Sequence, residues 1–232
     1  AELKAAYRFF DNPAIDTDGI LVPHIDRTLE RLAQLPVVLV AADTTEFNLS
    51  HLPSPQGLGY LSSPLPLRGF LMHSLLAVSP EGLPLGVLGL KTWIRPPEQM
   101  GKKHRRTHLP VSEKESVKWI EGVEHLATLK ARCPTTRLVA VGDREADLYD
   151  LFMTERPAGV DWLVRAAWDR GVAHPQRHLW ATLGTAPLLG HVELPLSSRH
   201  DQPARVAHVA VRALPVRLRP PQRGGRTGLP EQ

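Results

Sequence analysis

Val37-Val38-Leu39-Val40-Ala41-Ala42-Asp43 is a short apolar run that follows Pro36 and ends in an aspartate. Its length and its β-branched residues predict a buried strand. A second run of this kind, Arg137-Leu138-Val139-Ala140-Val141-Gly142-Asp143, also ends in an aspartate. With helical segments between and around them, the two runs predict a mixed α/β sheet with flanking helices.

The remaining segments supply the other elements of this domain. Residues 1–35 are expected to be helical, with a break at Asp11-Asn12-Pro13. Residues 70–78 and 83–93 predict a hairpin around the turn at 79–82. Further expectations are loops over 48–66 and 95–110, a helix from Ser112 with a buried stripe (Val117, Ile120, Val123, Leu126, Leu129), a short helix over 145–155 and a strand over 160–166.

Ser112 and Glu115 have the spacing of a capping box, in which each side chain binds a free backbone amide at the start of a helix. The sequence therefore predicts that this helix begins at Ser112.

Composition sets limits on the class of protein. The chain has 232 residues, 42% of them hydrophobic, which is enough for a packed core, and Lys plus Arg exceed Asp plus Glu by 28 to 24. This balance is compatible with a nucleic-acid partner. The single cysteine, Cys133, excludes an intrachain disulfide and a cysteine-based zinc site. No apolar run approaches the roughly 18 residues that span a bilayer, so no membrane partner and a cytoplasmic location are expected.

Asp43 and Asp143 are the candidate site residues. Ligands of open α/β sheets bind at the carboxyl ends of the strands, so the two carboxylates converge if their strands are neighbours. Paired carboxylate oxygens suit Mg²⁺ or Mn²⁺. The alternative is purely structural: Asp143 would cap the helix that follows it, and Asp43 would be a turn residue.

Several blocks of the chain, in order, resemble insertion-sequence DDE transposases of the Tn-five type. Asp143-Arg144-Glu145-Ala146-Asp147 is similar to the segment around the second catalytic aspartate of that family, and Asp43-Thr44-Thr45 to the segment around the first. The other blocks are Ala6–Pro13, His73-Ser74 and Glu113–Trp119.

The resemblance implies an RNase H-like fold followed by the start of a β-rich insertion. It implies that Asp43 and Asp143 are catalytic and hold Mg²⁺ or Mn²⁺ for DNA cleavage and strand transfer, with transposon ends and target DNA as partners. Members of the family work as homodimers. The corresponding division of the chain is 1–35, remnant of an N-terminal helical region; 36–167, first part of the catalytic core; 168–216, partial insertion; and 217–232, disordered basic tail.

One departure from the family concerns the third acid, a glutamate in a Tyr-x2-Arg-x3-Glu-x6-Lys pattern. The last tyrosine here is Tyr149, and Glu155, Glu193 and Glu231 lack that context. Compared with the family, the chain looks truncated at both ends. We therefore expect it to be inactive alone.

Three further readings stay open. Another RNase H-like nuclease would need a third carboxylate, such as Asp147 or Glu145. A non-catalytic DNA-binding remnant would need only positive charge, and a fragment could also fail to fold stably. The basic residues Lys102, Lys103, Arg105 and Arg106 could contact phosphates or belong to a solvated loop.

Overall fold

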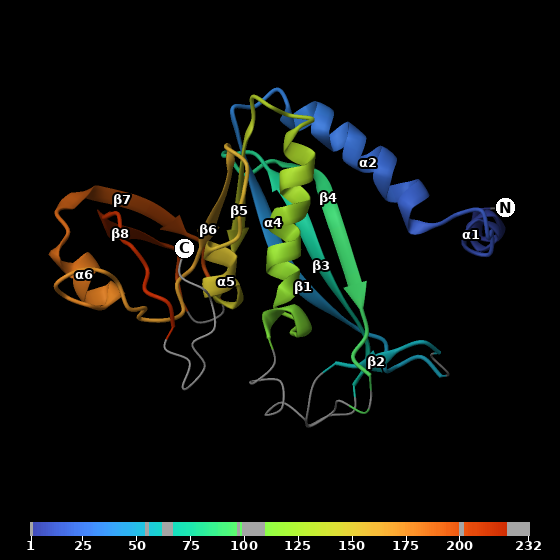
Figure 1. Cartoon of the computed structure of the whole chain (residues 1–232). Coiled ribbons are helices and arrows are strands. Elements are labelled where there is room, and N and C mark those ends of the chain that lie inside the picture. The colour runs from blue at the N-terminus through green and yellow to red at the C-terminus, as the bar shows by residue number, and fades with distance from the viewer. Residues whose placement is uncertain are drawn as a thin grey trace. The chain divides into compact units, whose positions relative to one another are not determined.

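The chain forms two compact units, Ala1–Ala166 and Ala167–Gln232 (Figure 1). The computed structural model describes residues 2–53, 56–61, 67–96, 98, 110–199 and 202–221. A six-stranded mixed sheet lies in the first unit, and a two-stranded sheet lies in the second.

β1 (Val37–Asn48) is the central strand of the first unit. It pairs antiparallel with β3 (Arg68–Val78) on one edge and parallel with β5 (Arg137–Gly142) on the other. The outer strands are β2 (Gly59–Tyr60) and β4 (Pro84–Trp93), both antiparallel to β3, and β6 (Val160–Val164), parallel to β5. The mixed sheet and the hairpin of β3 and β4 are confirmed.

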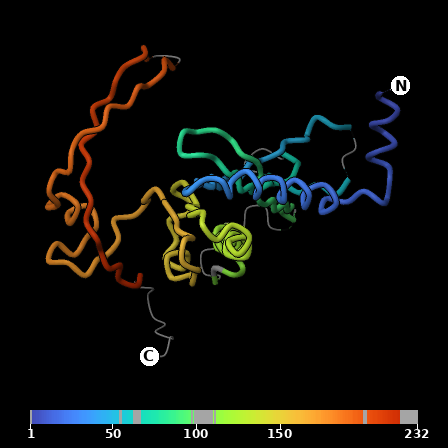
Figure 2. Tube along the Cα trace, turned by 90° about the horizontal axis from the view of Figure 1, so that it is seen from above, coloured from blue at the N-terminus to red at the C-terminus, as the bar shows by residue number. Residues whose placement is uncertain are grey.

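Helices flank this sheet, as the sequence predicts. α4 (Val117–Lys130) runs along the strands, whereas α2 (Thr17–Leu32) crosses them, and α4 is seen end-on in the second view (Figures 1 and 2). α1 (Glu2–Phe10) precedes α2, after the expected break, and buries none of its residues. The short elements are the 3₁₀ turns η2 (Val111–Glu113) and η3 (Arg144–Ala146) and the helix α5 (Tyr149–Phe152).

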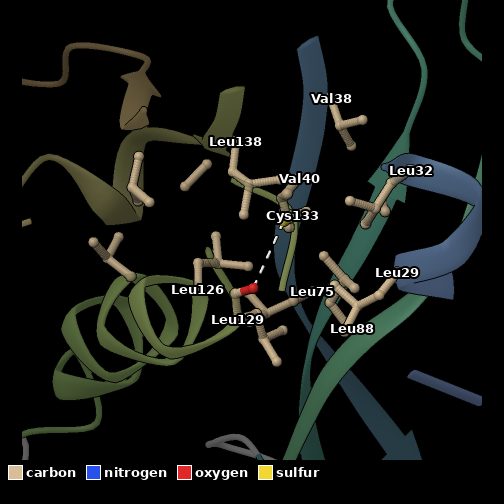
Figure 3. Packing of buried hydrophobic residues seen from close by; sticks show 14 of the residues in the cluster. Leu29, Leu32, Val38, Val40, Leu75, Leu88, Leu126, Leu129, Cys133 and Leu138 are labelled. Carbon is tan, nitrogen blue, oxygen red and sulfur yellow. Dashed lines mark hydrogen bonds between the residues drawn. The ribbon is translucent and has the colours of Figure 1, made fainter. Parts of the chain in front are cut away.

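The core lies between the helices and one face of the sheet. Val38 and Val40 of β1 are fully buried, whereas Ala41 and Asp43, whose side chains alternate to the other face, are exposed. Figure 3 shows the apolar side chains of α2, α4 and the strands meeting in one cluster. Its labelled members are Leu29, Leu32, Val38, Val40, Leu75, Leu88, Leu126, Leu129, Cys133 and Leu138.

β1 is longer than the apolar run that predicts it. The sequence predicted a strand that ends at Asp43, but residues 43–48 continue to pair with β3, from Asp43–Ser74 to Asn48–Gly69. Cross-strand hydrogen bonds therefore extend the strand through mostly polar residues, none of which is buried in the core. Within the predicted loop 48–66, the structure also contains the short strand β2.

The predicted capping box at Ser112 is wrong, because Glu115 has another partner. Arg95 donates from Nε to Glu115 Oε1 (2.6 Å) and from Nη2 to Oε2 (2.7 Å), and it also bonds Glu46 and the carbonyl oxygen of Leu61. α4 therefore begins at Val117, and its first amides donate to carbonyls three residues back. The hydrogen bonds of the Arg95 guanidinium therefore connect the segment before α4 to the ends of β1 and β4.

The buried stripe of α4 is also rotated from the predicted one. Val123, Leu126 and Leu129 are buried as expected, but Val117 and Ile120 are only partly buried. The stripe includes instead Lys118, Trp119 and Gly122. The buried face of α4 therefore includes a charged residue, Lys118, in the first turn of the helix.

The helix predicted over 145–155 is replaced by η3 and α5. Asp143 accepts a hydrogen bond from the Glu145 amide and opens a single 3₁₀ turn, and the extended backbone at Leu148 (φ −113°, ψ 131°) separates the two elements. The strand predicted over 160–166 is confirmed as β6.

The second unit contains two antiparallel strands, β7 (Leu188–Leu196) and β8 (Arg205–Arg212), and a helix that was not predicted, α6 (Leu179–Thr185). The tail was predicted to be disordered from Arg217, which is wrong for its first residues. Leu218 bridges Val172, and the Arg219 amide donates to the Gly171 carbonyl. Residues 222–232 lie outside the described residues.

No helix within the described ranges is long and apolar enough to cross a membrane.

Leu126, fully buried where α4 packs on the sheet, provides a test of this core. We expect Leu126→Ala to lower the free energy of unfolding by about 2–5 kcal/mol, because it removes buried methyl groups and leaves a cavity. Leu83→Ala is the control, since Leu83 is 64% exposed and its loss should cost less than about 0.5 kcal/mol. Urea unfolding of both variants measures the difference, and equal losses would contradict the packing described.

Candidate functional site

The pairing of β1 with β5 brings the two candidate aspartates to the same end of the sheet. In every residue pair of this parallel ladder, from Val37–Arg137 to Ala41–Val141, the two residue numbers differ by 100. Asp43 and Asp143 each follow the last pair by two residues, so the same offset relates them where this ladder ends. Both are exposed, and strand alternation directs both to the face away from the core.

Each aspartate is held by a backbone amide close to it in sequence. Asp143 Oδ1 accepts from the Glu145 amide (2.8 Å), and Asp43 Oδ1 accepts from the Thr44 amide (2.7 Å). The structural interpretation, in which Asp143 caps the segment that follows it, is therefore correct for Asp143 Oδ1. Asp43, in contrast, is a strand residue and not a turn residue. Where the chain is described, the other carboxylate oxygen of each aspartate accepts no hydrogen bond, so it remains for another ligand.

His73 lies on β3, directly opposite Thr44 of β1, on the core side of the sheet. It is only 3% exposed, its Nδ1 is 3.0 Å from the Thr44 hydroxyl oxygen, and its ring meets Trp119 edge to face. Burial, together with the nearby Lys118 ammonium, lowers the pKa of His73 to about 4, although the Asp43 carboxylate partly opposes this shift. The ring is therefore neutral near pH 7.

Lys118 is the charged residue that α4 buries. Its side chain is 7% exposed, and Nζ lies 5.6 Å from the ring centre of Trp93 and 5.7 Å from that of Trp119. It also pairs with Glu145 Oε2 at 3.3 Å. Glu145 is the residue whose amide holds Asp143, so the ion pair links α4 to the turn that carries the second aspartate.

Among the described residues, a third carboxylate does not join the two aspartates. Within the described part of the chain, no group of three or more His, Cys, Asp or Glu residues could hold a metal ion. Glu145 is engaged by Lys118, and Asp147 is 4% exposed, directed into the protein rather than to the surface where Asp143 lies. The observed arrangement is thus a pair of carboxylates.

The sequence did not point to Lys118, Trp93 or Thr44 as site residues. A lysine one position before a tryptophan in a helix is an ordinary surface pattern, and only the rotation of α4 buries it. The spacing of Trp119, Gly122 and Leu126, a turn apart, is the one signal that could have revealed this rotation. The predicted phosphate contacts Lys102, Lys103, Arg105 and Arg106 lie outside the described residues.

The lowered pKa of His73 predicts a pH dependence of stability. Between about pH 6.5 and pH 4, the unfolded chain binds a proton at this position that the folded chain does not. The contribution of His73 is therefore complete above the unfolded pKa and is lost as the pH falls toward 4, at a total cost of up to about 3 kcal/mol.

Urea unfolding measures the free energy of unfolding at about pH 7 and about pH 4.5. Between these two pH values this free energy should fall less in His73→Asn than in the wild type, because asparagine does not titrate. His51→Asn, which alters an exposed histidine, should keep the wild-type loss. An unchanged loss in His73→Asn would contradict the buried, neutral ring.

No family model matches the chain. The geometry of the site is therefore the basis on which a function is proposed.

Proposed function

We propose that this chain is part of a DNA transposase of the DDE type, in which Asp43 and Asp143 hold Mg²⁺ or Mn²⁺ for cleavage and strand transfer of DNA. The observation that carries the proposal is the register of β1 and β5, in which Asp43 and Asp143 each follow the last pair of the ladder by two residues. The mixed sheet with flanking helices is compatible with an RNase H-like core.

The residues present fit such a metal. Mg²⁺ is commonly bound through one or two carboxylates, with water and substrate phosphate oxygens completing its shell. Asp43 and Asp143 are exposed, so phosphate and water can reach them, and each keeps an oxygen that the local backbone does not use. When bound, divalent metal would activate the attacking oxygen and stabilise the leaving oxygen of phosphoryl transfer.

The protein's own part is to hold the carboxylates in place. Thr44, which follows Asp43 in the strand, is hydrogen-bonded to the buried His73, and Glu145, whose amide binds Asp143, pairs with the buried Lys118. Each aspartate is therefore linked to a buried side chain through a neighbouring residue. Such support limits the movement of the two oxygens, which the geometry of phosphoryl transfer requires.

The pair of carboxylates favours an inactive chain. Members of a catalytic unit depend on one another, so the absence of one acid removes most of the rate. We therefore expect metal binding without DNA cleavage by this chain alone. Its role would then be that of a DNA-binding segment, or of a core completed by residues beyond the described ones.

Mn²⁺ titration by calorimetry tests the metal site. We expect the wild type to bind Mn²⁺, and both Asp43→Asn and Asp143→Asn to lower the affinity at least about tenfold, because each removes one of two charged ligands. Asp11→Asn, which alters an exposed aspartate at the end of α1, is the matched control and should bind as the wild type does.

Urea unfolding of each variant would verify that the fold is retained. Absence of Mn²⁺ binding in the folded wild type, or binding that neither substitution weakens, would refute the two-aspartate site.

A further inference from the structure

α1 has an apolar stripe that is exposed to solvent. Leu3, Tyr7 and Phe10 are spaced by four and three residues, so their side chains project from the same side of the helix. Their exposed fractions are 71%, 63% and 81%, and α1 as a whole buries none of its residues. This spacing is the pattern by which an amphipathic helix binds in an apolar groove.

Positive charge lies along one flank of this stripe. Lys4 and Arg8 are four residues apart and therefore share one side of α1, whereas Glu2 lies on the opposite flank. Among the described residues, neither cation takes part in an ion pair. A groove that accepts α1 is thus expected to be apolar, with negative charge on one side.

An apolar groove of about 400 Å³ lies between α2 and α4, above β3 and β4. Gly89 and Gly122 add no side chains that would fill it. Val22 is 53% exposed and Leu90 is 38% exposed, so apolar surface faces solvent here. The residues that line the groove are Asp18, Leu21, Val22, Ile25, His73, Leu75, Gly89, Leu90, Lys91, Lys118, Glu121, Gly122 and His125.

The charge of the groove is complementary to that of α1. Its two lysines are already paired, Lys91 with Glu121 and Lys118 with Glu145. Asp18 is exposed in the first turn of α2, and no ion pair within the described ranges engages it. The carboxylate of Asp18 therefore leaves the groove with a negative charge beside its apolar surface.

The lengths of the helix and the groove also agree. α1 has nine residues, which at the rise of an α-helix span about 13 Å. The side of the groove that α2 forms extends from Asp18 to Ile25, which corresponds to about 10 Å. The apolar stripe of α1 can therefore lie along α2 over most of its length.

The groove is not filled by the α1 of the same chain, because none of the described residues of α1 lines it. The segment after α1 is held in a turn. The Asp11 amide donates to the Tyr7 carbonyl (2.9 Å), and the Ile15 amide donates to the Asn12 carbonyl (3.0 Å). The Ala14 amide donates to Asn12 Oδ1 (3.0 Å). Folding α1 back onto its own α2 would rearrange this turn, whereas binding to another copy leaves it intact.

We propose that α1 binds in the groove between α2 and α4 of a second copy of this chain. Each copy has one stripe and one groove, so the exchange is reciprocal and closes a symmetric dimer. Tyr7 and Phe10 are the apolar anchors, and the flank with Lys4 and Arg8 faces Asp18 of the second copy. The groove does not include the two candidate metal ligands, so this inference stands or fails independently of the function proposed above.

Sedimentation of the full chain over a range of concentrations measures the monomer–dimer equilibrium. We expect Tyr7→Ser combined with Phe10→Ser to raise the dissociation constant at least about tenfold, because aromatic anchors contribute much of the affinity of an interface. Val22→Asp should act in the same way, since it places a charge in the apolar groove. The matched control is Leu83→Ser, which alters an exposed apolar residue outside the groove and should sediment as the wild type does.

Charge exchange separates a contact from a structural effect. Asp18→Lys alone, and Lys4→Glu combined with Arg8→Glu, should each weaken the dimer because they bring like charges together. All three substitutions in one chain restore the opposite charges and should recover most of the affinity. No recovery would overturn this placement of α1.

Thiol cross-linking identifies which chain supplies α1. The cysteine of the chain, Cys133, is fully buried, so a short thiol-specific cross-linker should react with introduced cysteines. Tyr7→Cys and Val22→Cys, prepared separately and then mixed, should give a covalent dimer, whereas Tyr7→Cys mixed with Leu83→Cys should not. A cross-link that forms only within chains carrying both Tyr7→Cys and Val22→Cys would show that α1 closes over its own groove.

That result would overturn the proposal. A wild type that remains monomeric at every concentration, or a dimer that the two serine substitutions in α1 leave intact, would also overturn it. Urea unfolding of each variant verifies that the core is retained.

Discussion

The pairing of β1 on both of its edges is the constraint on which the first unit depends. Antiparallel bonds to β3 and parallel bonds to β5 make β1 the strand that joins the hairpin to the helix-connected half of the sheet. Its register also decides which side chains face the core. A shift of one residue would place Val38 and Val40 in solvent and Asp43 under the helices. The buried apolar face therefore fixes the position of the candidate site.

One group of buried polar side chains lies near the start of α4. It consists of His73, Lys118 and the indoles of Trp93 and Trp119, whereas the residues labelled in Figure 3 are apolar. Such departures from an apolar core lower stability, and they are expected where a protein binds or reacts. Here they surround the edge that carries Asp43 and Asp143. The electrostatics of this end thus support a functional site more strongly than either aspartate does alone.

Much of the fold could be predicted from the sequence, because local patterns determine it. Apolar runs and turn residues located β1, the hairpin of β3 and β4, β5 and β6, and helix signals located α1, α2 and the body of α4. The strand that continues past Asp43, the start of α4 at Val117 and the ordered residues after Arg217 were not predicted. In each case a partner distant in sequence determined the outcome: β3 extends β1, Arg95 takes Glu115, and Gly171–Ala173 bind the start of the tail.

The candidate site also has features that the sequence determines and features that depend on contacts between distant residues. The sequence by itself determined that two short apolar strands each lead to an aspartate, since composition and periodicity are local properties. Only the tertiary structure decided that these strands are parallel neighbours, in a register that brings Asp43 and Asp143 to the same end of their ladder. It alone decided that Lys118 is buried between two indoles, because the rotation of a helix depends on the sheet against which it packs.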